Sequence, residues 1–166
     1  MVTSVIIHDI RSTHNVGSIL RTCDGFGIKK VYIGGISPYP LVTNDSRLPH
    51  LSAKLTKDIA KTALGAEQTI VIELYDDLSD LLARLKDVGT KVIGLEQTPN
   101  SLNIRTFTAA EDVVLLLGRE VEGIDTEYLT LCDYILEIPM VGKKESFNVS
   151  VATGIALYQL SRTPSP

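Results

Sequence analysis

The sequence lacks the features that would mark a membrane or exported protein. Its 166 residues contain no apolar run near the ~20 residues that span a bilayer. The N-terminus has no basic leader followed by a long apolar region. We therefore expect no membrane partner and no secretory signal.

The sequence is also poor in metal ligands. Cys23 and Cys132 form no CxxC pair, and the three histidines, His8, His14 and His50, lack the spacing of a zinc site. Unpaired thiols are typical of a reducing compartment. We therefore predict a cytoplasmic protein without a metal site.

The net charge of −4 argues against a protein that coats nucleic acid non-specifically. It leaves room for an RNA-binding enzyme, because such an enzyme needs only a local basic patch. Each basic residue is equally compatible with an ordinary solvated surface. The candidates for a patch are Arg11, Arg21, Lys29, Lys30, Lys143 and Lys144.

Short apolar runs recur along the chain and alternate with helical segments. Because the runs are continuous rather than alternating, they fit parallel strands covered on both faces. They are Val5–Ile7, Val31–Ile33, Ile70–Leu74, Val92–Leu95, Val113–Leu117 and Tyr134–Ile138. Helices are expected at Val16–Cys23, Leu51–Leu64 and Leu78–Val88, with a short one at Asp125–Leu131 capped by Asp125. The pattern predicts an α/β fold, a mainly parallel sheet with helices on both faces, as a single domain over 1–160 with a short tail at 161–166.

The last predicted helix, Val149–Leu160, has no polar face. A helix that is apolar all round is buried on more than one side. Two arrangements are open: the helix is sandwiched within its own fold, or its second side forms a homodimer interface.

No phosphate-binding loop marks a ligand site early in the chain. The first strand is followed by HDIRSTHNVG, which has no GxGxxG, and the later GKKES does not complete a Walker motif. Ligands of open parallel sheets bind beyond the carboxyl ends of the strands. Small residues at those ends admit a ligand closely, and they occur at Gly34–Gly35, Gly94–Leu95, Gly118 and Pro139–Gly142. The sequence therefore favours a site built from late segments.

Three polar motifs, in order, give a specific resemblance. The first has Asn15 and Arg21 six residues apart. The second is a glycine, a glutamate and a glycine at 118, 120 and 123. The third is Ile138, Pro139 and Met140, followed by Ser146, Phe147 and Asn148 before the last helix. Together they resemble the SpoU (TrmH-like) branch of the SPOUT RNA methyltransferases over nearly the whole chain. Phe147 stands where the family pattern has leucine, a mild apolar change.

This resemblance implies a C-terminal trefoil knot that holds S-adenosylmethionine. The implied cofactor residues are Leu95, Gly118, Ile138, Met140 and Ser146, with Gly118 letting the adenine approach the backbone. Without the resemblance, the three apolar members of this set would be read as core residues.

The resemblance also implies that Arg21 is catalytic, with Asn15, Glu120, Ser146 and Asn148 around it. Because a guanidinium stays protonated, we expect it to clamp an RNA phosphate rather than accept a proton, with Glu120 as a possible ion-pair partner. Simpler roles are open: Asn15 and Glu120 as helix caps, and Arg21 as a surface ion-pair partner.

The implied activity is the S-adenosylmethionine-dependent methylation of a ribose 2′-hydroxyl in tRNA or rRNA by a homodimer. Two alternatives are a non-catalytic relative that binds the cofactor and RNA, and a methyltransferase of the same fold that modifies a base.

Overall fold

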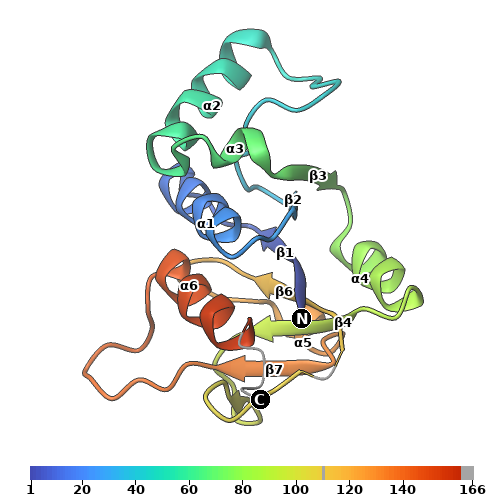
Figure 1. The fold of residues 1–166 in the computed structure, drawn as a ribbon, viewed down its shortest axis with the longest axis vertical. Helices are drawn as coiled ribbons and strands as arrows, with labels where there is room; N and C mark the ends of the chain where they lie inside the picture. Colours follow the sequence, from blue (N-terminus) through green and yellow to red (C-terminus); the bar gives the residue numbers. More distant parts are fainter. Residues whose placement is uncertain (110, 162–166) are drawn as a thin grey trace.

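The computed structural model describes residues 1–109 and 111–161 (Figure 1). Its strands are β1 (Val2–His8), β2 (Lys30–Gly34), β3 (Val71–Tyr75), β4 (Lys91–Leu95), β5 (Leu102–Asn103), β6 (Val113–Leu117) and β7 (Tyr134–Glu137). Its helices are α1 (Thr13–Gly25), α2 (Pro49–Ala63), α3 (Ala66–Thr69), α4 (Leu78–Asp87), α5 (Thr126–Leu129) and α6 (Val149–Leu160).

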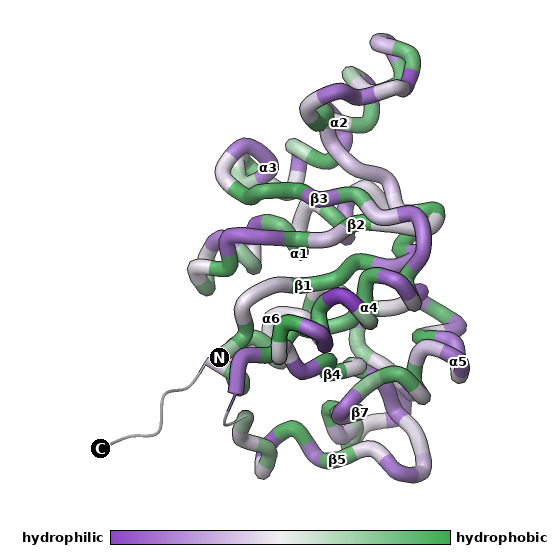
Figure 2. Tube along the Cα trace, turned by 90° about the vertical axis from the view of Figure 1, so that its right-hand side faces the viewer, coloured by the Kyte–Doolittle hydropathy of each residue, from purple (hydrophilic) through white to green (hydrophobic). Residues whose placement is uncertain are grey.

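The strands form one parallel sheet in the order β3-β2-β1-β6-β4-β7-β5. This confirms the predicted α/β class. The sheet order places β3 and β5 at opposite edges of the sheet, and α2 and α3 lie at the β3 end of the molecule (Figure 2). The elements β5 and α3 were not predicted, because two and four residues are too short to show a hydrophobic period. The trefoil knot stays a prediction.

Alternate side chains of the central strands enter two separate cores. Val5 and Ile7 pack with α1, α2 and α6 on one face, while Ile6 packs with α4 on the other. The same division continues in β6, where Leu115 and Leu116 enter opposite cores. Continuous apolar strands are therefore explained by helices on both faces of the sheet, as predicted.

Helix α1 begins three residues earlier than the apolar pattern indicates. Ser12 is its N-cap, and its hydroxyl accepts a hydrogen bond from the backbone N–H of Asn15 at 3.2 Å. Asn15 is therefore not the cap, and its side chain is available for other contacts. Gly17 lets α2 pack closely on α1, because a Cβ there would meet the carbonyl oxygen of Ile59 at 2.3 Å.

Helix α6 buries one side and leaves part of the other exposed. Thr153, Ala156 and Leu157 are fully buried. Val151 and Tyr158, on another side of the helix, are 50% and 64% exposed.

The helix ends at Leu160, so Ser161 alone of the predicted tail is described, and residues 162–166 lie outside the described residues.

The boundaries of two other elements shift slightly. The strand predicted from Ile70 begins at Val71, and the helix predicted over Leu51–Leu64 is α2. Leu64 ends α2 in the left-handed region with φ of 52°, ahead of Gly65.

Over residues 1–109 and 111–161, no helix combines the length and apolar character needed to cross a membrane.

Candidate active site

A cavity lies at the carboxyl ends of three neighbouring strands, β6, β4 and β7. Because parallel strands end at the same edge, segments far apart in sequence meet here. The loop before α6 and the first turns of α6 close the cavity. Its lining residues are Leu95–Gln97, Leu117–Val121, Gly123, Leu136–Ile138, Met140, Glu145–Phe147, Val149 and Ala152.

All five residues assigned to the cofactor line this one cavity. They are Leu95, Gly118, Ile138, Met140 and Ser146. Leu95 and Ile138 are also partly packed against the hydrophobic core. The alternative prediction that these are core residues therefore holds for part of each side chain. The structure thus brings together Leu95 and residues from the second and third motifs.

Gly118 has a structural role that the sequence did not reveal. A Cβ at this position would lie 2.6 Å from the backbone carbonyl atoms of Gly123. The two segments are joined by paired backbone hydrogen bonds between Arg119 and Gly123, of 3.1 and 3.2 Å. The turn therefore requires glycine at position 118 for its own packing, and the expected approach of adenine to this backbone stays a prediction.

Glu96 completes this turn and was missed by sequence reasoning. Its carboxylate accepts a hydrogen bond from the backbone N–H of Ile124 at 2.9 Å. Gly123 has a φ of +72°, and a Cβ there would meet the same carboxylate oxygen at 1.9 Å. A glycine is needed here for both the left-handed backbone and the close approach of Glu96.

Arg119 anchors the same turn through three carboxylates. Its guanidinium is hydrogen-bonded to Asp125 and lies 3.7 Å from Asp9 and 3.6 Å from Glu122. The hydrogen bond to Asp125 raises the pKa of Arg119 above its already high value. Asp125 does occupy the predicted N-cap position of α5, but its side chain makes no cap hydrogen bond and binds Arg119 instead.

Glu120 connects the cavity to the start of α1. Its carboxylate accepts hydrogen bonds from the Asn15 side-chain amide at 3.1 Å and from the backbone N–H groups of Ser12 and Arg11 at 3.2 and 3.3 Å. Burial raises the pKa of Glu120, but these hydrogen bonds outweigh it and hold the pKa below its ordinary value. Glu120 therefore caps the entry to α1, rather than the helix after Gly123.

Asn15 joins Glu120 to the last helix. Its Oδ1 accepts a hydrogen bond from the Asn148 side chain at 3.1 Å. Asn148 is the N-cap of α6, and its Oδ1 accepts from the backbone N–H of Ser150 at 2.9 Å. Glu120, Asn15 and Asn148 thus form one connected group, which we call the polar triad. Ser146 lies two residues before Asn148 and lines the cavity.

Arg21 is not part of the polar triad. It lies six residues after Asn15, roughly 9 Å further along α1, on the exposed side of the helix. Among residues 1–109 and 111–161, the Arg21 side chain has no hydrogen bond or ion pair, so neither the expected Glu120 partner nor a surface ion pair is present. The hydrogen-bonding capacity of Glu120 is used at the start of α1.

The cavity suits S-adenosylmethionine in the chemistry of its lining. Leu95, Ile138 and Met140 offer an apolar slot for a flat base. The carboxylates of Glu96 and Glu145 also line the cavity and match a ligand that carries positive charge. The described part of the chain has no group of three or more possible metal ligands.

The fold and cavity define an α/β protein whose cofactor site is built late in the chain, at the ends of parallel strands. A family comparison agrees: the model of the SpoU rRNA Methylase family matches residues 3–158. The chain belongs to this family.

Individual relatives point the same way. The chain is 29% identical over 158 residues to a tRNA (guanosine(18)-2′-O)-methyltransferase of Aquifex aeolicus, with 95% of this chain and 68% of the relative covered. It is 28% identical over 159 residues to the enzyme of that name from Escherichia coli K12, with 96% and 62% covered. The chain thus spans about two thirds or less of these relatives' length.

Solved structures confirm the fold. The structure of the A. aeolicus TrmH/SpoU tRNA modifying enzyme aligns with a TM-score of 0.78 at 26% identity, covering 97% of this chain and 75% of that one. An AdoMet-bound rRNA methyltransferase from Sinorhizobium meliloti aligns with a TM-score of 0.79 at 24% identity, covering 95% and 55%. At that identity the second match supports the fold alone.

Proposed function

We propose that this chain is a cytoplasmic, S-adenosylmethionine-dependent enzyme that methylates a ribose 2′-hydroxyl of tRNA or rRNA. One observation carries the proposal: the polar triad lies at the edge of the cavity, through Glu120, and all five expected cofactor residues line that same cavity. The names of the two relatives as 2′-O-methyltransferases support it.

The residues proposed to hold the cofactor are Leu95, Gly118, Ile138, Met140 and Ser146. When bound there, S-adenosylmethionine supplies a methyl group on a positively charged sulfur. Transfer to a 2′-hydroxyl would break the methyl carbon–sulfur bond and form a carbon–oxygen bond, leaving neutral S-adenosylhomocysteine, with the hydroxyl proton passing to solvent water. The protein must therefore align the hydroxyl with the methyl group and keep water from competing.

Glu120 is poorly suited to accept that proton. Its lowered pKa and its hydrogen bonds from Asn15 and two backbone N–H groups keep the carboxylate ionised and occupied. We assign it a positioning role: Glu120 fixes the Asn15 amide, and Asn15 in turn is fixed to Asn148. The triad thereby holds the start of α1 against the start of α6 at the edge of the cavity.

Arg21 supplies the phosphate clamp in this proposal. A guanidinium binds a phosphate through two parallel hydrogen bonds, and such a contact would orient the neighbouring ribose. Arg21 is exposed and has no partner within the described residues, so its donors are available to RNA.

A homodimer would bring Arg21 to a cavity. Val151, Ile155 and Tyr158 form a partly exposed apolar stripe on α6, at helical spacing, with Gly154 between them. Arg21 lies next to Thr22, whose methyl carbon would be 3.8 Å from a Cβ at Gly154. We propose that two copies pair through this stripe and that Arg21 of one copy serves the cavity of the other.

The test is methyl transfer from radiolabelled S-adenosylmethionine to tRNA and rRNA from a strain that lacks the enzyme. Alkaline hydrolysis of the product should leave the label in dinucleotides, because a 2′-O-methyl group blocks cleavage of the following phosphodiester bond. Label in mononucleotides would favour the base-modifying alternative. No transfer to either RNA, together with tight cofactor binding, would favour a non-catalytic relative.

A further inference from the structure

Helix α2 lies at the outer end of the molecule (Figures 1 and 2). Its sequence carries a one-sided row of basic residues. His50, Lys54, Lys57 and Lys61 recur every three or four positions and are all exposed. This spacing places them on one face of the helix, over roughly 16 Å of its length. We call this set the basic stripe.

The basic stripe lies on the exposed side of α2, where Lys57 also borders a groove lined by Glu67 of α3. The buried residues of α2, Ser52, Ile59 and Ala63, lie on the opposite side of the helix. Lys61 is paired with Asp58 at 2.7 Å, but Lys54 and Lys57 have no ion pair within residues 1–109 and 111–161. Two of the lysines are therefore free to bind an external anion.

Charge is divided between the two helical layers, although the whole chain is acidic. The layer of α1, α2, α3 and α6 has four lysines and arginines against three carboxylates. The layer of α4 and α5 with their N-caps has five carboxylates against two cations. A polyanion that approaches this molecule is therefore attracted to the α2 side and repelled by the α4 side.

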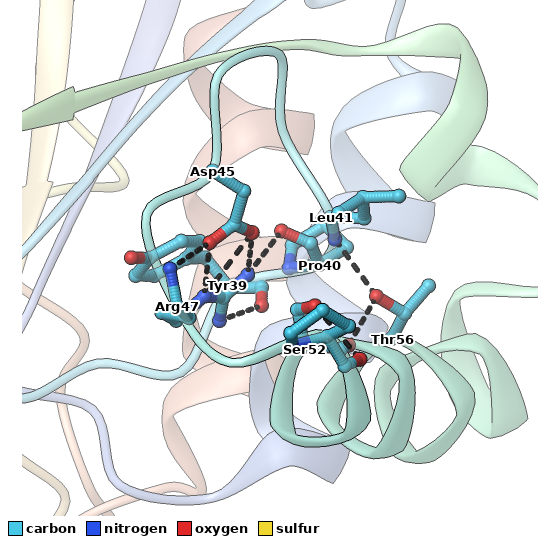
Figure 3. Close-up of polar contacts among 8 residues, drawn as sticks. Tyr39, Pro40, Leu41, Asp45, Arg47, Ser52 and Thr56 are labelled. Atoms are coloured by element: carbon cyan, nitrogen blue, oxygen red, sulfur yellow. Dashed lines mark hydrogen bonds and ion pairs between the residues drawn. The ribbon is translucent and has the colours of Figure 1, made fainter.

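The loop that leads into α2 is braced by a largely buried ion pair (Figure 3). The Arg47 guanidinium binds Asp45, donates to two backbone carbonyls of the same loop and stacks 3.6 Å above the Tyr39 ring. Thr56 of α2 accepts a hydrogen bond from the backbone N–H of Leu41 at 2.8 Å. This brace uses the Arg47 donors internally, so it serves to hold the loop and α2 in a fixed position rather than to bind a ligand.

Helix α2 is also fixed to the helix that carries Arg21. Gly17 permits close packing of the two helices, and the Thr62 hydroxyl donates to the carbonyl oxygen of His14 at 2.9 Å. His14 lies two turns before Arg21 on the same side of α1. The basic stripe therefore has a fixed relation to the phosphate clamp.

We propose that the basic stripe binds the phosphodiester backbone of the substrate RNA, away from the nucleotide that is methylated. This inference rests on the proposed function and names a second contact for the same substrate. RNA is the occupant that the charge favours, because the stripe is polybasic and regularly spaced. The exposed apolar side chains beside it, Leu51 and Leu64, lie near its two ends. Its contribution is sequence-independent affinity, while the chemistry stays at the cavity.

The test compares the triple variant K54Q/K57Q/K61Q with wild type in steady-state methylation of unmodified tRNA or rRNA at several salt concentrations. Glutamine keeps helix propensity and most of the side-chain stem, and the positions are exposed, so the variant should fold. We expect the KM for RNA to rise about tenfold or more, and the slope of log KM against log salt to fall by about 2. The kcat at saturating RNA and the affinity for S-adenosylmethionine should not change.

The matched control is R84Q/K86Q/K91Q, which removes the same charge from α4 and the start of β4. It should leave the KM for RNA and its salt slope near wild type, because those residues are paired with Glu73 and Asp133 in surface ion pairs of small energetic value. An unchanged KM and slope in the K54Q/K57Q/K61Q variant, or an equal effect in both variants, would overturn the inference. An inactive wild type would refute the proposed function instead.

Discussion

Asn148 donates a hydrogen bond to Asn15 over 3.1 Å, although 133 residues separate them in the chain. The contact joins the N-terminal ends of α1 and α6, and Glu120 holds Asn15 from the other side. Two segments that each look like ordinary helix starts in the sequence thereby become one edge of the cavity.

The first prediction concerns this contact. Asn15→Ala removes the amide that links Glu120 to Asn148, so we expect single-turnover methyl transfer to slow by about 10- to 100-fold through lost positioning. Cofactor affinity by calorimetry should hold, because Asn15 does not line the cavity. Ser18→Ala, one turn further along α1, is the matched control and should transfer at the wild-type rate. Equal rates for all three proteins would remove the triad from the mechanism.

The second prediction concerns the apolar slot. Met140→Ala should weaken S-adenosylmethionine binding by about tenfold, since it removes roughly 1–2 kcal/mol of apolar contact. Val141→Ala alters the next residue, which is 96% exposed, and should bind like wild type. Calorimetric titration measures both. If the two variants bind with equal affinity, the methionine does not contact the cofactor.

The fold was more predictable than the site. Continuous apolar strands and intervening helices required a covered parallel sheet, because no other arrangement buries both faces of strands such as β6. Small residues at the strand ends already indicated Leu95, Gly118 and Met140 as part of a ligand site, but only the resemblance assigned them to the cofactor. The roles of Glu96 and Arg119, and the packing of Gly118 on Gly123, depend on contacts that the motifs do not specify. The start of α1 at Ser12 was missed for a similar reason, since Glu120, 108 residues away, completes its capping.

The third prediction concerns the pH dependence of stability. His8 lies at the end of β1, with its Nδ1 2.8 Å from the Tyr75 hydroxyl. Burial lowers the pKa of His8 below 6.5, although the carboxylates of Asp9 and Asp125 oppose part of this shift. As pH drops below about 6.5, the His8 imidazole therefore binds a proton more readily in the unfolded chain than in the folded protein. The free energy of unfolding falls accordingly.

Chemical denaturation between pH 7 and 5 tests this assignment. His8→Gln keeps a hydrogen-bonding group but removes the titration, so its stability should change less with pH than that of wild type. His50→Gln, at an exposed position in α2, should keep the wild-type slope. A wild-type slope in the His8 variant would show that another group causes the pH dependence.

The fourth prediction concerns Arg21. Because this residue is exposed, Arg21→Ala leaves no core cavity and should fold with normal cofactor affinity. We expect a loss of about 10²- to 10⁴-fold in single-turnover transfer if it clamps the phosphate beside the reacting ribose. Arg21→Lys should recover little of this, since an ammonium cannot form the paired planar contact. Wild-type turnover in Arg21→Ala would refute the catalytic assignment.

The last prediction decides whether Arg21 acts across a dimer. Sedimentation should first give about twice the chain mass of 18.1 kDa. Ala152 lies on α6 and lines the cavity. The larger side chain in Ala152→Phe should fill the cofactor slot and leave the turn at Gly118 and Gly123 unchanged. Neither Arg21→Ala nor Ala152→Phe should be active alone. Co-expression with two different tags and sequential purification then isolates the mixed dimer.

In a mixed dimer with shared sites, one cavity is open and receives Arg21 from the Ala152→Phe copy. The other cavity, in the Ala152→Phe copy, is blocked, and the partner copy next to it lacks Arg21. About half of the wild-type activity should therefore return. If each Arg21 serves its own cavity, every site in the mixed dimer carries one defect, and activity stays at the level of the parent variants. That outcome, or a monomer that methylates RNA, would exclude the shared site.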